Sequence, residues 1–264
     1  GPLTGLHLDR AQNLRDQENS LVVLRLGAAH RSEAPPRRIC EPKTGAVTVV
    51  AFDEMLGGPP GSSGQTNYAE ALRGLLAARY PELAFTFRRS GPEGGAECSP
   101  LERFLHLSRS MGRSRINVAL LVCQPQSVIN GVPVGEFEKC LSASVDQVLK
   151  RSRAEVIVLT PPPVPGSPAA ARPYARAAKR VGLRKGVPVV DLYSRFLLTE
   201  DWEGLFQPGT GRYPSFRLYP NERGQERIAR EVYAAFIENF HRDISAGMRK
   251  VMLMRAARPA PPGR

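Results

Sequence analysis

Two adjacent carboxylates, Asp53 and Glu54, directly follow an apolar run that suits a buried strand. Ligands of parallel α/β folds bind beyond the carboxyl ends of the strands, so a carboxylate there could act as a general base or a metal ligand. Neighbouring residues on an extended chain point to opposite sides, so the two carboxylates are not expected to reach one substrate together. The pair therefore indicates an enzyme site only if one of them acts alone.

Other candidates for nucleophile or base have weaker support. Ser62 and Ser63 lie in a loop rich in Gly and Pro, residues 59–64, with no base nearby. A serine needs such a base to become a nucleophile, so neither is expected to react. His106 falls in an amphipathic segment, residues 101–111, that is expected to be a helix. We therefore interpret His106 as structural.

The cysteines show no metal-ligand spacing, and the sequence predicts neither a metal site nor a cofactor. They are Cys40, Cys98, Cys123 and Cys140. Cys123 ends an apolar segment and Cys140 lies on an expected helix, so both are predicted to be small core residues. Cys40 and Cys98 are expected in loops, where they could pair with each other.

Five apolar, β-branched segments are expected to form the strands that carry these groups. They span residues 46–52, 83–87, 117–122, 155–160 and 187–193. Their continuous apolar character is typical of parallel strands buried on both faces, and helical segments lie between them. This alternation predicts an α/β fold with a doubly wound parallel sheet and right-handed crossovers.

Several helices are expected between and after these strands. One runs to residue 79 with Thr66 as its cap, another spans residues 134–148, and a third opens at Arg172. A last helix carries apolar residues at four-residue spacing, which would form one buried stripe. These residues are Ile228, Val232 and Phe236.

The loop before this last helix resembles the final motif of the SGNH (GDSL-type) hydrolases, Asp-x-x-His-Pro-Asn-x-x-Gly. Pro220, Asn221 and Gly224 match the Pro, Asn and Gly of that motif. The resemblance implies that the Asp and His would complete a serine triad, but Phe216 and Tyr219 hold those two positions.

The first family motif, Gly-Asp-Ser with a later Gly, aligns with the end of the first expected strand. Asp53 and Gly58 match its Asp and its later Gly, whereas Phe52 replaces the first Gly and Glu54 occupies the nucleophile position. A carboxylate lacks the hydroxyl that a base would activate, so it cannot repeat serine ester chemistry.

The two oxyanion motifs are also incomplete. The glycine of the second motif could be Gly91 or Gly94, although an ordinary turn explains either residue. The asparagine of the third motif, which follows the third expected strand, falls on Pro125 or Gln126 next to Gln124. Pro has no side-chain donor, and Gln would donate from a longer arm.

A further order of motifs is similar to that of bacterial SGNH hydrolases of the acetyl-esterase type. A strand leads to Thr160-Pro-Pro, then an Arg-Pro-Tyr helix at 172–174, then Val-Pro-Val-Val-Asp-Leu-Tyr at 187–193. The resemblance covers residues 46–240 and implies an SGNH-hydrolase-like sandwich, a central five-stranded parallel sheet with helices on both faces.

Segments outside the resemblance are expected to be additions to this domain. Residues 1–45, with a plausible strand at 20–26, would be an N-terminal extension or linker. Residues 241–264 would form a basic amphipathic helix and a disordered tail. This helix could dock on a partner or an anionic surface, or pack on its own domain.

The loop at residues 200–216 carries Trp202, Phe206, Tyr213 and Phe216. Aromatic side chains near the carboxyl ends of strands could stack on sugar rings. They could equally form a lid packed over a site that has lost its function.

The chain has 264 residues, a net charge of +12 and a pI near 10.1. This charge would suit nucleic acid or anionic glycans, but the arginines are scattered and also fit a basic surface without a specific partner. No apolar run has the roughly 20 residues of a membrane span. Gly1-Pro2 resembles the remnant of a removed tag, so the localisation stays open.

The sequence thus predicts a catalytically inactive SGNH-like module that binds or scaffolds another protein or a tandem esterase-like domain. One alternative is an ester hydrolase with an altered site that uses Asp53 or Glu54, and another is a binder of nucleic acid or anionic glycan. The candidate pocket consists of Asp53, Glu54, Gly91, Gly94, Gln124, Gln126, Tyr219 and Asn221.

Overall fold

A five-stranded parallel sheet organises the chain in the computed structural model, with the strand order β2-β1-β3-β4-β5. The structure describes residues 45–52, 67–89, 116–123, 125–152, 154–208 and 219–256. The strands are β1 (Ala46–Phe52), β2 (Ala84–Arg89), β3 (Val118–Val122), β4 (Glu155–Leu159) and β5 (Val189–Val190). The predicted sheet, with its five parallel strands, is confirmed.

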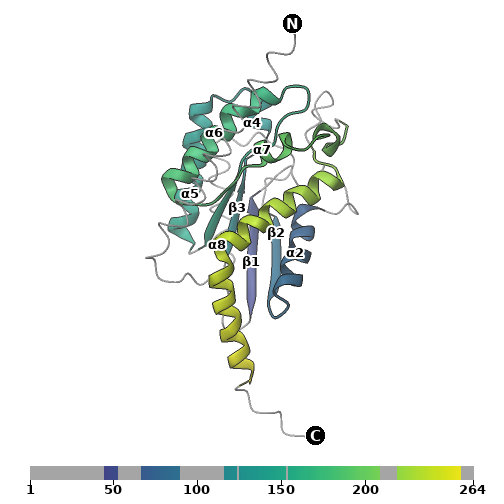
Figure 1. Ribbon diagram of the computed structural model, residues 1–264. Coiled ribbons are helices and arrows are strands. Elements are labelled where there is room, and N and C mark those ends of the chain that lie inside the picture. Colours follow the sequence, from purple (N-terminus) through teal and green to yellow (C-terminus); the bar gives the residue numbers. More distant parts are fainter. Residues whose placement is uncertain are drawn as a thin grey trace.

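Helices cover both faces of this sheet, as expected (Figure 1). They are α2 (Tyr68–Arg79), α4 (Gln126–Ile129), α5 (Val134–Arg151), α6 (Pro168–Lys185), α7 (Leu192–Leu197) and α8 (Glu222–Ala256), with a 3₁₀ turn, η1 (Glu203–Leu205). The pair α2 and α8 packs together on one face, and the pair α5 and α6 packs together on the other.

Alternate residues of each strand supply the cores of the two faces. In β3, Val118, Leu120 and Val122 join the core beneath α2 and α8. Ala119 and Leu121 join the core beneath α5 and α6. All five are fully buried, which explains why the strand reads as a continuous apolar run. Cys123 is buried in the second core, as predicted, and Cys140 is half-buried on α5.

The boundaries of several elements differ from the predicted ones. The fifth strand was expected over 187–193 but contains only two residues, because the Asp191 side chain accepts a hydrogen bond of 3.2 Å from the Ser194 amide and caps α7. The helix expected to open at Arg172 begins at Pro168, in the first helical turn where proline is tolerated. Asn67, rather than Thr66, caps α2.

The last helix, α8, is continuous over 35 residues and does not break at residue 241. Its predicted stripe of Ile228, Val232 and Phe236 is fully buried, and Ile244 and Val251 are buried in the same core. Figure 1 shows α8 changing direction part-way along, after which it extends beyond the sheet. The buried residues near its end favour packing on its own domain, although Leu253 beside them is 71% exposed.

Some expectations lie outside the described residues, namely the strand at 20–26, the helix at 101–111, and the positions of Cys40 and Cys98. The domain boundaries at residues 45 and 240 remain a prediction. Within the described ranges, no helix is both long and apolar enough to cross a bilayer.

Candidate functional site

The loop that precedes α8 lies against the segment around η1. The amide of Gln207 donates to the carbonyl of Tyr219 at 2.9 Å, and the amide of Asn221 donates to the carbonyl of Leu205 at 2.8 Å. Phe206 and Pro220 form an antiparallel bridge between these hydrogen bonds. Backbone pairing to a segment about 15 residues upstream therefore sets the position of Tyr219 and Asn221.

Asn221 uses both ends of its side chain to hold this loop. Its Nδ2 donates to the Gly204 carbonyl at 2.7 Å, and its Oδ1 accepts from the Gly224 amide at 3.1 Å. The second bond is that of a helix N-cap, which satisfies an amide that the first turn of α8 leaves without a helical partner. Asn221, predicted as a pocket residue, thus has a structural role here.

Tyr219 is the residue that the sequence analysis aligned with the histidine of the SGNH motif. It packs against a small core cluster formed by Val164, Ala171, Ala175 and Tyr193. A phenol lacks the ring nitrogen with which a histidine accepts a proton at neutral pH, so tyrosine does not replace histidine as a general base. The side chain is only half-buried, and its apolar contacts are those of a packing residue.

Gln126 is the first residue of α4, immediately beyond the carboxyl end of β3. Its Oε1 is buried and has no hydrogen-bond partner within the described part of the chain. Val128 and Ile129 of the same short helix pack against the cluster that Tyr219 also contacts. The structure therefore brings α4 and Tyr219 to one region of the fold.

The remaining predicted site residues lie outside the part of the chain that the structure describes. They are Asp53, Glu54, Gly91, Gly94, Gln124 and Phe216. Their roles stay predictions.

A buried polar network beyond the carboxyl ends of β4 and β5 was missed by the sequence reasoning. Asp191 Oδ2 lies 2.8 Å from Lys179 Nζ and accepts a second bond of 2.8 Å from Ser194 Oγ. Thr160 Oγ1 donates weakly to Asp191 Oδ1 at 3.4 Å and accepts from the Tyr193 amide at 3.1 Å. Polar residues that directly follow two buried strands were the signal that could have revealed it.

This network contains a serine, a lysine and an aspartate, but its geometry favours a structural role. The Ser194 hydroxyl donates to a carboxylate that an ion pair already neutralises. Ser194 is only 5% exposed, so a substrate carbonyl has no access to its oxygen. Asp191 also starts α7, so the network fixes the end of β5 to the helices that follow it.

The aromatic residues near η1 form a packed group. Phe206 is 2% exposed, and its ring centroid lies 5.4 Å from that of Phe196 and 6.1 Å from that of Trp202. These two contacts favour the packing alternative over sugar stacking for Trp202 and Phe206. Tyr213 lies outside the described residues.

The groups with shifted pKa values lie elsewhere in the described part of the chain. Burial raises the pKa of Tyr80 and of Tyr174, and the hydrogen bond from Arg180 lowers the pKa of Glu138. None of these three groups belongs to the loop before α8 or to α4. The described residues also hold no cluster of three or more potential metal ligands.

Solved structures with the same arrangement identify the fold. A lipase/acylhydrolase from Enterococcus faecalis superposes with a TM-score of 0.58 and 15% sequence identity, covering 72% of this chain and 94% of that one. The chain has the fold of the SGNH (GDSL-type) hydrolases. No protein-family model and no curated protein sequence matches it.

Two further solved structures superpose on this chain with similar TM-scores. An acetyl-xylooligosaccharide esterase from Geobacillus stearothermophilus has a TM-score of 0.57 and 16% identity, over 76% of this chain and 95% of that one. A lipolytic protein of the G-D-S-L family from Veillonella parvula has a TM-score of 0.55 and 15% identity, and the match covers 72% of this chain and 97% of that one. Identities this low establish a shared fold.

Proposed function

We propose that this chain is a catalytically inactive SGNH-fold module that binds another molecule. The observation that carries the proposal is Tyr219, which occupies the family's histidine position and packs against Val164, Ala171, Ala175 and Tyr193. A phenol in this environment lacks the basic ring nitrogen of a histidine, so it offers no base for a serine or a water molecule.

The other positions of the family's machinery support the same proposal. Serine hydrolysis needs a nucleophile, a base with its orienting acid, and donors for the oxyanion. The aligned positions hold Glu54, Tyr219 and Phe216, with Pro125 or Gln126 at the oxyanion asparagine. Loss of one triad member typically costs about 10⁴-fold or more in rate, so the combined loss leaves no route to that reaction.

A binding role is compatible with an SGNH fold that lacks the residues for ester hydrolysis. The similar structures are described as an acylhydrolase and an esterase, and these activities belong to those proteins. Another protein, or a tandem esterase-like domain, is the partner class that we propose for this module. Function resides in sites rather than in folds, so the shared architecture is compatible with a binding role.

Hydrolysis of p-nitrophenyl acetate tests this proposal. The wild-type chain would be compared with Glu54→Ala, with a control Glu238→Ala at an exposed position of α8, and with the triple variant Glu54→Ser, Phe216→Asp, Tyr219→His. We expect the wild-type rate to equal the buffer rate. Wild-type turnover that is lost in Glu54→Ala and kept in Glu238→Ala would instead establish an altered enzyme built on Glu54.

A further inference from the structure

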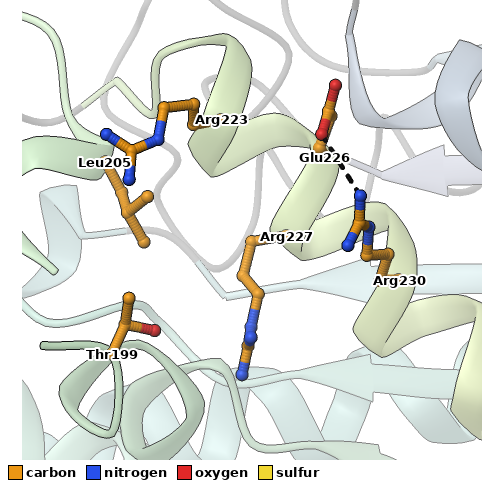
Figure 2. A pocket seen from close by; sticks show the side chains of 6 residues that line it. All are labelled: Thr199, Leu205, Arg223, Glu226, Arg227 and Arg230. Carbon is orange, nitrogen blue, oxygen red and sulfur yellow. Dashed lines mark ion pairs between the residues drawn. The ribbon is translucent and has the colours of Figure 1, made fainter. Parts of the chain in front are cut away.

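A basic pocket of about 190 Å³ lies between the first turns of α8 and the segment around η1. Its lining residues are Thr199, Leu205, Arg223, Glu226, Arg227 and Arg230. Three arginines against one glutamate give this lining a formal charge of +2. Figure 2 shows Arg223 next to Leu205 and Arg227 across the opening from Thr199, whereas Arg230 turns towards Glu226.

The arginines of this pocket differ in how they are held. Arg227 Nε lies 3.0 Å from Glu231 Oε1, and Arg195 Nε lies 3.3 Å from the other oxygen of the same carboxylate. The Glu231 side chain is only 16% exposed, so this shared carboxylate fixes Arg227 in place. Arg230 pairs with Glu226 at 3.5 Å, and both side chains are at least half exposed, so that pair is weak.

Arg223 is the arginine whose charge is not compensated by such a contact. Its side chain is exposed, and it makes no hydrogen bond or ion pair within the ranges that the structure describes. It also lies in the first turn of α8, where the helix dipole disfavours a cation and favours an anion. A bound anion beside Arg223 would remove this unfavourable interaction.

We propose that this pocket binds a tetrahedral oxyanion, the phosphate or sulfate group of a ligand. The planar guanidinium of Arg223 would donate two parallel hydrogen bonds to the oxyanion. Arg227 and Arg195 share the single negative charge of Glu231, so these three groups together would supply one further positive charge. The Thr199 hydroxyl, whose bond to the Arg195 carbonyl is weak at 3.4 Å, would be a further donor. Drug-sized ligands occupy pockets of roughly 300–1,000 Å³, so the smaller volume here suits a single anionic group.

This inference rests on the proposed binding role and deepens it, because it names the chemical class that the module would recognise. It also gives part of the +12 charge of the chain a specific location. The scattered arginines of the sequence did not indicate it, since Thr199 and Leu205 meet the α8 arginines only in the folded chain.

Calorimetric titration of the full chain with inorganic phosphate, and separately with sulfate, at low ionic strength tests the proposal. The variants are Arg223→Gln and the control Arg73→Gln, which removes an exposed arginine from α2. We expect saturable binding that weakens about tenfold or more in Arg223→Gln, the effect of losing a charged hydrogen bond, and stays unchanged in Arg73→Gln. The anion that binds with the higher affinity, phosphate or sulfate, indicates whether the ligand carries a phosphate or a sulfate group. Either result supports the site.

Three results would overturn the proposal: no saturable binding by the wild type, equal weakening in both variants, or binding of a single-stranded oligonucleotide without binding of free phosphate. The second would show a general charge effect, and the third an extended nucleic-acid surface. Arg223 is exposed, so we expect its variant to keep the wild-type melting temperature. Ester hydrolysis by the wild type would contradict catalytic inactivity without changing phosphate affinity, so the two failures are distinguishable.

Discussion

The side chain of Asn221 joins two segments, because its Nδ2 donates to the Gly204 carbonyl at 2.7 Å while its Oδ1 caps α8 through the Gly224 amide at 3.1 Å. In an SGNH-like motif the same residue type would precede the helix beside the catalytic histidine. In this chain Asn221 caps α8, and the alignment predicted from the sequence places Tyr219 at that histidine. Asn221 thus connects the start of α8 to the η1 segment.

Replacing Asn221 tests how much this connection stabilises the fold. Asn221→Ala removes the cap and leaves the Gly204 carbonyl without its donor, so we expect the free energy of unfolding to fall by about 1–3 kcal/mol. Asn221→Ser keeps an oxygen that can cap the helix and should cost less. Urea-induced unfolding measures both, and equal stability of wild type and Asn221→Ala would contradict this role.

Gly224 is packed so closely that a side chain does not fit. A Cβ placed there would lie 2.3 Å from the Leu205 carbonyl oxygen and 2.8 Å from Pro220 Cβ. We expect Gly224→Ala to destabilise the protein by about 1–3 kcal/mol, because backbone must shift. Gly74→Ala is the matched control, since nothing lies within 4 Å of a Cβ on that helical position. The control should be stabilising by roughly 0.5–1 kcal/mol, and the same sign for both variants would refute the packing argument.

Tyr80 links α2 to α8 through its hydroxyl, which lies 2.8 Å from His241 Nδ1. We expect Tyr80→Phe to lose about 0.5–1.5 kcal/mol of stability near neutral pH. Burial raises the pKa of Tyr80 in the folded state, against an opposing effect of Arg79. The wild type should therefore lose stability as the pH rises above about 10, where the tyrosine of the unfolded chain ionises first.

The comparison of wild type with Tyr80→Phe isolates this alkaline effect. The phenylalanine cannot ionise, so the stability advantage of the wild type should shrink steadily above pH 10. Unfolding measured by far-UV circular dichroism at several pH values provides the check. A difference that is constant with pH would show that burial of this hydroxyl is not coupled to ionisation.

Glu138 on α5 receives hydrogen bonds from Arg180 and Arg184 on α6. The bond from Arg180 is the main cause that lowers the pKa of Glu138 in the folded state. A lowered pKa contributes stability above the pKa of the unfolded glutamate, about 4.3, and this contribution is lost as the pH falls below it. Both arginines are about half exposed, so solvent screening limits the effect to about 1 kcal/mol or less.

The variant Glu138→Gln should accordingly be less stable than the wild type at pH 7, and the difference should vanish as the pH falls below about 4. Glu238→Gln, at an exposed position of α8, is the control and should show little difference at either pH. Thermal unfolding of each variant and the wild type, measured at pH 7 and at pH 3, tests this prediction. A deficit of Glu138→Gln that persists at pH 3 would contradict an electrostatic origin.

The strands could be predicted because burial on both faces imposes a local pattern. The segments expected as strands at 46–52 and 155–160 are mostly apolar, and β1 (Ala46–Phe52) and β4 (Glu155–Leu159) lie within them. The end of β5 could not be predicted in the same way. Asp191 turns the chain into α7 through hydrogen bonds to Thr160 and Ser194, and Thr160 is a residue 31 positions away.

The sequence by itself determined the five strands, the long helices α2, α5, α6 and α8, and the buried stripe of α8, because each depends on residue type and short-range spacing. The tertiary structure alone decided that Asn221 holds η1, that Tyr219 packs against Val164 and Tyr193, and that Arg223 shares a pocket with Thr199. These relationships join residues that are distant in sequence. Their geometry follows from how the helices pack on the sheet, which no local pattern encodes.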